Sequence, residues 1–333
     1  MITISKQEIT SYQGEQIALF RITNSPGAYA EVINYGATLV SIVIPDKSDR
    51  LSNVILRYKN IEDYFTDNAY LGSTVGRVAN RISNAQFTLN EQIYHLDKND
   101  GKHINHGGFN GFSKKIFDYS IHDNSVVFSL KSHDGECGFP GEISFSVTYS
   151  FNDKNELQIG YQAVSNKLTP FNPTNHAYFN FLFHEENILN HELRIYADTY
   201  LESTDEFIPT GRILSVKDTA FDFRQYRTFN EMLPLKKEII KGYNTYFISS
   251  DTTNKLKKLA SLKEENSSRQ MDMYSTMPGC MIYTGDYLSG SHIPFGGVCL
   301  EAQYHPDGLN HNFPANLLYP GKEAKEVIKY CFL

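Results

Sequence analysis

The chain has 333 residues, and its 31 lysines and arginines against 38 aspartates and glutamates give a formal net charge of -7. This balance argues against a nucleic-acid-binding surface, which needs a basic stripe, and no stretch approaches the roughly 18 apolar residues of a membrane span. The start MITISKQEIT is too polar for a signal peptide. The four cysteines have no CxxC spacing and indicate isolated reduced thiols: Cys137, Cys280, Cys299 and Cys331. A cytoplasmic location is therefore expected.

Short segments with alternating apolar and polar residues dominate the chain, and they are rich in β-branched side chains, as is typical of β-strands. The first candidates are residues 30–36, 38–44 and 53–58. Three hairpins are predicted next, over residues 86–96, 117–132 and 143–165, with turns at Asn90–Glu91, Asp123–Asn124 and Asn152–Asn155. Later strand candidates are residues 192–197, 279–285, 296–304 and 326–332.

Helical periodicity is confined to residues 61–69 and 256–266, and the polar stretch 261–270 is predicted to be a solvated surface loop. Many short strands with regular turn signals and no βαβ rhythm predict an all-β sandwich or barrel with few short helices. No linker, repeat or low-complexity tract interrupts the chain. A single domain over residues 1–333 is therefore the simplest expectation.

Two stretches carry more polar residues and glycines than a plain β core needs. In TVGRVANRI (74–82) two arginines and an asparagine lie between apolar residues, so a partly buried guanidinium is expected, bonded either to a structural carboxylate or to the hydroxyls of a ligand. In HINHGGFNGF (103–112) the glycines after His106 allow close backbone approach. His103 and His106 lack a nearby acidic or cysteine partner at familiar spacing, so a metal site is not expected there.

Two further stretches place ionisable side chains inside strand-like segments. PFNPTNHAYFNF (170–181) surrounds His176 with asparagines and aromatic residues, and read alone this histidine fits a core residue better than a catalyst. In VCLEAQ, alternation puts Val298 and Leu300 on one face and Cys299 and Glu301 on the other. A buried acid is costly unless it is paired or used. Glu301 is thus either a general base with a perturbed pKa or part of a structural salt bridge.

The remaining chemistry is proton transfer. The chain has no GxSxG motif, no Walker loop and no dinucleotide fingerprint. One glutamate, two histidines and an Asn-Arg pair form a possible acid/base set for a neutral, hydroxyl-rich substrate, and sugars are the obvious class.

These stretches resemble those of the aldose 1-epimerases, the galactose mutarotases. The similarity covers nearly the whole chain, because NYGATLVSIVIPD, LGSTVGRVANRI, INHGG, NPTNHAYFNF, FDFR, YTGDYL and CLEAQYHPDGLNH follow one another in the order of the family. The resemblance implies one large antiparallel β-sandwich of the galactose mutarotase type. It also implies a free aldohexose as substrate, with no metal and no organic cofactor.

The resemblance assigns roles to individual positions. Glu301 matches the family's general base, His176 its general acid and His106 its second active-site histidine. In mutarotation the base removes the proton of the anomeric hydroxyl while the acid protonates the ring oxygen, the ring opens, C1 rotates and the ring closes again. The positions expected to contact the sugar are Asn80, Arg81, Asn244 and Tyr178.

Two positions depart from the family pattern. Asn244 stands where the family commonly has aspartate, and Met281 where some members have glutamine. A charge-assisted hydrogen bond contributes about 1.5–3 kcal/mol against about 0.5–1.5 kcal/mol for a neutral one. The departures therefore affect the preferred sugar more than the type of reaction.

Other functions remain open on the sequence. One alternative is an epimerase for another aldose, including a hexose 6-phosphate, whose phosphate would need extra basic residues near the cleft. A non-catalytic carbohydrate-binding protein on the same fold would be expected to lack Glu301 or one histidine. A glycosidase would need a second carboxylate such as Asp286, whose context resembles a turn. Monomer and homodimer are both compatible with the sequence.

Overall fold

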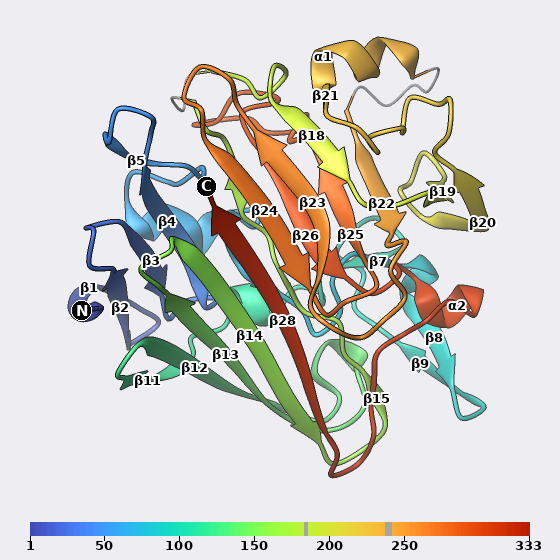
Figure 1. The fold of residues 1–333 in the computed structure, drawn as a ribbon. Helices are drawn as coiled ribbons and strands as arrows, with labels where there is room; N and C mark the ends of the chain where they lie inside the picture. Colours follow the sequence, from blue (N-terminus) through green and yellow to red (C-terminus); the bar gives the residue numbers. More distant parts are fainter. Residues whose placement is uncertain (183–185, 237–241) are drawn as a thin grey trace.

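The computed structural model describes residues 1–182, 186–236 and 242–333. An N-terminal sheet with the order β1-β2-β3-β4-β5 opens the fold, and its neighbouring strands are antiparallel. It lies on the left in Figure 1. Its strands are β1 (Thr3–Tyr12), β2 (Glu15–Thr23), β3 (Tyr29–Ile33), β4 (Thr38–Pro45) and β5 (Leu51–Asn53).

The largest sheet of the described residues has nine strands in the order β11-β12-β13-β14-β28-β24-β23-β18-β21. The C-terminal strand β28 lies near its middle, between β14 and β24 (Figure 1). Its strands are β11 (Asp118–His122), β12 (Ser125–Ser132), β13 (Ile143–Phe151), β14 (Glu156–Ser165), β18 (Glu192–Ile195), β21 (Arg227–Thr228), β23 (Lys257–Lys263), β24 (Gln270–Ser275) and β28 (Glu323–Phe332).

A six-stranded sheet with the order β17-β26-β25-β22-β19-β20 carries much of the cleft described below. Figure 1 shows β25 and β26 behind β23 and β24. The strands are β17 (Tyr178–Phe179), β19 (Thr199–Ser203), β20 (Pro209–Ser215), β22 (Asn244–Ile248), β25 (Gly279–Tyr283) and β26 (Val298–Gln303).

Small paired strands and short helices connect the sheets. The paired strands are β6 (Thr74–Val75) with β16 (Thr174–Asn175), β7 (Arg81–Ile82) with β10 (Ile104–Asn105), β8 (Gln86–Leu89) with β9 (Gln92–His95), and β15 (Thr169–Pro170) with β27 (Leu317–Leu318). The helices are η1 (Ile61–Thr66), η2 (Ser83–Ala85), η3 (Phe112–Lys114), η4 (Glu136–Gly138), α1 (Phe229–Met232), η5 (Leu233–Leu235) and α2 (Gly308–His311). The predicted all-β class with few short helices is confirmed, and no helix of the described residues is long and apolar enough to cross a membrane.

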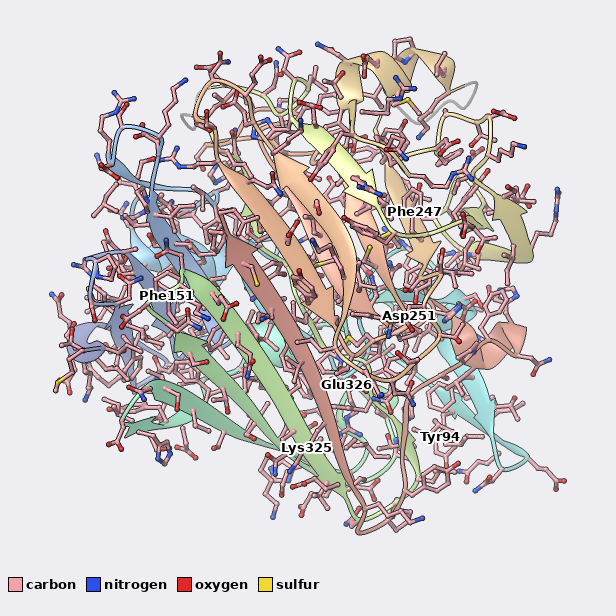
Figure 2. All side chains as sticks on the ribbon, viewed as in Figure 1. Tyr94, Phe151, Phe247, Asp251, Lys325 and Glu326 are labelled. Atoms are coloured by element: carbon pink, nitrogen blue, oxygen red, sulfur yellow. The ribbon has the colours of Figure 1, made fainter. Side chains whose placement is uncertain are left out.

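The sheets share an apolar core. Phe151 on β13 and Phe247 on β22 lie in different sheets (Figure 2), yet both belong to the largest cluster of buried apolar side chains. The β28 residue Tyr330 packs its ring 5.0 Å from that of Phe179 and donates its hydroxyl to the Leu300 carbonyl at 3.2 Å. These two contacts hold the six-stranded sheet against β28.

Alternation along β28 explains how one strand faces both solvent and core. Lys325 is exposed and its neighbour Glu326 is buried (Figure 2). Glu326 accepts hydrogen bonds from the Tyr304 hydroxyl at 2.7 Å and the Thr276 hydroxyl at 2.5 Å. A buried acid can therefore be purely structural when both of its oxygens are bonded.

The three predicted hairpins are confirmed, with turns at the predicted positions. The predicted helix over residues 256–266 is wrong, because most of it is strand β23, which pairs with β18 on one side and β24 on the other. Burial between neighbouring strands overrides a weak helical pattern. The predicted loop 261–270 is wrong in part, since Glu264 and Arg269 are buried. The strand predicted over 53–58 is also wrong, because β5 ends at Asn53 and is followed only by an isolated bridge between Ile55 and Phe179.

Candidate active site

A cleft of about 510 Å³ contains all of the site residues predicted from the sequence. They come from distant parts of the chain, since β7, β22 and β26 carry several of them (Figure 1). Its floor is buried, whereas Thr66, Asn68, Tyr287 and Ser289 at its rim are exposed. The predicted residues that line the cleft are Asn80, Arg81, His106, His176, Tyr178, Asn244 and Glu301.

Glu301 and His176 form the centre of the floor. β26 places Glu301 beside β17, where Cys299 pairs with Tyr178, and the segment just before β17 carries His176. His176 Nε2 lies 3.6 Å from Glu301 Oε1. The second carboxylate oxygen, Oε2, is buried and has no hydrogen-bond partner among the described residues. It is therefore available to accept a bond from a ligand.

Burial shifts both groups toward their uncharged forms. It raises the pKa of Glu301 to about 8 and lowers the pKa of His176 to about 4, because an apolar surrounding disfavours charge. At neutral pH the pair therefore holds one proton. Transfer of this proton from the Glu301 carboxyl to the His176 imidazole gives a carboxylate and an imidazolium, and the pair still holds one proton.

His106 has a defined tautomer. Its Nδ1 accepts the backbone N–H of Asn80 at 3.2 Å, and its own backbone N–H donates to the Asn80 carbonyl at 3.2 Å. Burial lowers its pKa well below the usual value, so the ring is neutral and Nε2 carries the proton. His106 can therefore act as a hydrogen-bond donor, and its ring lies 5.2 Å from that of His176.

The glycine after His106 is required by the backbone. Gly107 has a φ of +87°, and a Cβ at this position would lie 1.9 Å from the carbonyl oxygen of Gly76. The close approach predicted from the sequence is confirmed. This close approach packs the loop that carries His106 directly against the segment from Gly76 to Asn80.

The two arginines of residues 74–82 have different roles. Arg77 is buried away from the cleft and donates to the carbonyls of Pro140 and Gly141 at 2.9 and 3.0 Å and to the Ser132 hydroxyl at 2.6 Å. Arg81 lines the cleft and its Nε donates to Asp100 at 2.6 Å. The buried Arg77 guanidinium is thus bonded to carbonyls and hydroxyls instead of the expected carboxylate, whereas Arg81 in the cleft wall is the arginine that pairs with one.

The two other expected contact residues line the wall. The Tyr178 ring lies 5.1 Å from the His176 ring, and its hydroxyl donates to the Ala69 carbonyl at 2.9 Å. Asn244 lies at the start of β22, and Met281 on β25 is paired directly with Glu301. The two departures from the family pattern thus both face the cleft.

One group of side chains in the described residues could be considered as metal ligands: His176, Cys299 and Glu301 each offer an atom within 4.8 Å of the others. The thiol of Cys299, however, approaches Nδ1 of His176 at 3.5 Å, whereas Glu301 approaches Nε2. The closest contacts lie at different ring nitrogens. This arrangement fits an imidazole held between a thiol and a carboxyl better than a converging ligand set.

Several residues in the cleft or directly beside it were not predicted from the sequence. Cys299 was recognised only as sharing a face with Glu301, and its contact with His176 depends on β17 lying beside β26. Phe207, Tyr283 and Tyr287 line the cleft from loops and strand ends. The abundance of tyrosine and phenylalanine, 22 of each, was the available signal, but it suits a β core equally well.

Comparisons with known proteins agree with this geometry. The family model described as aldose 1-epimerase matches residues 18–331. Galactose mutarotase of Mus musculus is 38% identical over 312 residues, covering 91% of this chain and 90% of that protein. Aldose 1-epimerase of Escherichia coli is 32% identical over 333 residues, covering 96% of each.

Solved structures give the same result. A GalM/aldose epimerase homologue from C. elegans superposes with a TM-score of 0.89 at 29% identity, covering 99% of both chains. Galactose 1-epimerase from Lactobacillus acidophilus superposes with a TM-score of 0.86 at 27% identity, covering 100% of this chain and 99% of that one. With its family model, its relatives and its fold in agreement, the chain belongs to the aldose 1-epimerase family.

Proposed function

We propose that this protein interconverts the α and β anomers of a free aldohexose such as galactose or glucose. The observation that carries the proposal is the buried pair at the cleft floor, where His176 Nε2 lies 3.6 Å from Glu301 Oε1. Opening a hemiacetal requires a base at the anomeric hydroxyl and an acid at the ring oxygen in the same step. A carboxyl and an imidazole that share one proton supply both.

The sugar enters with its anomeric carbon toward the floor. The anomeric hydroxyl donates to the free Oε2 of Glu301, which favours the carboxylate and moves the shared proton to His176. Glu301 then removes the hydroxyl proton while His176 protonates the ring oxygen, and the C1–O5 bond breaks. After rotation about C1–C2, the same two groups work in reverse on the other face of the aldehyde.

His106 and the residues around it orient the sugar. The Nε2–H of His106 donates to a sugar oxygen, because its Nδ1 is already occupied by the backbone N–H of Asn80. Arg81 and Asn80 face the hydroxyls on one side of the ring, and Asn244 and Tyr178 line the other walls. Holding the ring in one pose brings the reacting atoms close to both catalytic groups.

The composition of the cleft disfavours the alternatives. Among the described residues that line it, Arg81 is the one cation with a permanent charge and is paired with Asp100, so a phosphate group lacks a dedicated partner. Glu301 is the one carboxylate in that lining, whereas a glycosidase uses two. Asp286 instead accepts the backbone N–H of Gly242 at 3.2 Å.

We also propose that residues 1–333 form a single domain in the cytoplasm. One apolar cluster includes side chains from all three large sheets. All four cysteines are free thiols, which fits a reducing compartment.

Polarimetry tests the proposal directly. Freshly dissolved α-D-galactose and α-D-glucose should reach their equilibrium rotation faster with the protein than in buffer alone. Protein carrying His176→Asn serves as the matched control, because it keeps a polar side chain but loses the acid, and its rate should fall on the order of 10²–10⁴-fold. Wild-type protein no faster than buffer on any common aldose would refute the catalytic proposal.

A further inference from the structure

The thiol of Cys299 is a buried group to which the proposed proton transfer assigns no part. Cys299 lies on β26 two residues before Glu301, and its Sγ approaches Nδ1 of His176 at 3.5 Å. The opposite ring nitrogen, Nε2, lies 3.6 Å from Oε1 of Glu301. The imidazole of His176 therefore has one side-chain partner at each nitrogen, and both partners come from the same face of the same strand.

Within the described part of the chain, no further side chain forms a hydrogen bond or ion pair with this imidazole. Its other neighbours pack against it as rings, with centres 5.9, 5.2, 5.1 and 6.4 Å away: Tyr70, His106, Tyr178 and Tyr283. Cys299 itself is fully buried and does not line the cleft. Any effect of the thiol on a sugar must therefore pass through His176.

The two nitrogens of His176 have different tasks in the transfer. To accept the proton of Glu301, Nε2 must be unprotonated, so the permanent proton of the neutral imidazole has to be on Nδ1. Burial lowers the pKa of His176 to about 4, while the backbone carbonyl of the same residue acts in the opposite direction and favours a protonated ring. Nδ1 is the ring nitrogen nearer to that carbonyl, and a carbonyl can only accept, so this interaction also favours a proton on Nδ1.

The sulfur of Cys299 provides an acceptor for the Nδ1 proton. Burial raises the pKa of Cys299 well above its usual value, so the group is a neutral thiol whose sulfur accepts weakly. When the O–H bond of Glu301 breaks and the Nε2–H bond forms, the ring becomes an imidazolium, and the contact from Nδ1–H to sulfur strengthens because its donor is charged. Nε2 then gives its proton to the ring oxygen while the carboxylate takes that of the anomeric hydroxyl. Both groups return to their starting forms, and the Nδ1 proton has not moved.

We propose that Cys299 is a positioning residue that keeps the permanent proton of His176 on Nδ1 and leaves Nε2 free to carry the mobile one. This inference rests on the proposed mutarotase function. His106 holds the opposite tautomer, because its Nδ1 accepts the backbone N–H of Asn80. The two histidines of the cleft thus divide the work: His106 donates a fixed hydrogen bond from Nε2, whereas His176 takes up and releases a proton there.

Nitrogen NMR of the whole chain with 15N-labelled histidine reads the tautomers without any turnover. At pH 7 the His176 ring should have a protonated Nδ1 and an unprotonated Nε2, and His106 should show the reverse pattern. The signals that disappear in His176→Asn identify His176. Wild-type protein with the proton of His176 on Nε2 would overturn the proposal, whereas the expected tautomer without acceleration of any aldose would overturn the mutarotase function instead.

Variants of the thiol connect the tautomer to the rate. In Cys299→Ala the acceptor is lost, so the Nε2–H tautomer of His176 should become populated and kcat for α-D-galactose should fall about tenfold at unchanged KM. Cys299→Ser restores an acceptor and should keep kcat within about threefold of the wild type.

Cys280→Ala is the matched control, because Cys280 is a buried cysteine on the neighbouring strand β25 whose side chain belongs to the main apolar cluster. It should change neither kcat nor the tautomer of His176. An unchanged kcat in Cys299→Ala, or an equal loss in Cys280→Ala, would contradict the positioning role.

Discussion

The buried polar groups around Arg77 differ from those at the cleft floor. Both terminal nitrogens of the Arg77 guanidinium donate to carbonyls and hydroxyls from three segments, so its buried charge is bonded within the protein. Glu301 is equally buried, yet one of its oxygens has no partner and the other faces His176 at 3.6 Å. Both groups are costly to bury.

The difference indicates how each cost is offset. Around Arg77 the protein itself supplies the bonding partners, and the guanidinium links segments that are distant in the chain. At Glu301 the missing bond is left for a ligand, and burial raises the pKa of the carboxyl to about 8. A buried ionisable group that is bonded within the protein is a structural element, whereas one with a free atom facing a cleft is a catalytic candidate.

Glu301→Gln should have the largest effect on activity. The amide has nearly the same shape but cannot take a proton, so kcat should fall on the order of 10³-fold or more. Polarimetry with α-D-galactose measures the loss. Full activity in this variant would remove Glu301 from the mechanism.

Relative to the wild type, the same variant should gain stability as the pH rises. The folded carboxyl keeps its proton up to about pH 8, while the unfolded one loses it near 4.5. Between these values the folded state binds more protons, so the free energy of unfolding of the wild type falls with rising pH, by up to about 4 kcal/mol from this group. Urea titrations measure the free energy of unfolding of both proteins at pH 5 and pH 8. Any advantage of the wild type at pH 5 should be smaller or reversed at pH 8.

Arg77→Met should damage stability instead of chemistry. It leaves several buried carbonyl and hydroxyl groups unbonded, and the free energy of unfolding should fall by about 3–5 kcal/mol. Urea denaturation followed by fluorescence measures this loss. The folded fraction should keep a wild-type KM for galactose, and a changed KM with unchanged stability would reverse the comparison.

The pH dependence of kcat/KM tests the shared proton. Burial places the pKa of His176 at about 4 and that of Glu301 at about 8. The pair therefore gains a second proton below about pH 4 and loses its shared proton above about pH 8. Activity should be level between them and fall about tenfold per pH unit outside. Rates are taken after subtraction of the buffer-catalysed reaction, and a decline that starts between pH 5 and 7 would contradict the assignment.

Asn244→Asp should produce the smallest change. A carboxylate at the start of β22 would form a charge-assisted bond with a sugar hydroxyl, which lowers KM about tenfold while kcat changes little. Asn266→Asp adds the same charge on an exposed turn and should leave KM unchanged. Comparing galactose with glucose in both variants identifies the hydroxyl involved, and an unchanged KM in Asn244→Asp would place the side chain outside the substrate contacts.

Local patterns were sufficient for much of the fold. The hairpins at Asn90–Glu91, Asp123–Asn124 and Asn152–Asn155 were predictable because alternation and turn residues act between neighbours in the chain. Residues 256–266 were not, because β23 owes its conformation to pairing with β18 and β24. The burial of Arg269 was missed because its guanidinium donates to Phe181, Ile44 and Ser52, which are distant in the chain.

By itself, the sequence determined an all-β chain, its main hairpins and a set of acid/base residues in unexpected strand contexts. Its resemblance to a family assigned their roles. Only the tertiary structure decided that His176 lies between Cys299 and Glu301, that His106 keeps its proton on Nε2, and that aromatic rings extend the cleft to its mouth. These features depend on contacts between segments far apart in the chain, and burial of the paired groups shifts their pKa values only after those segments have met.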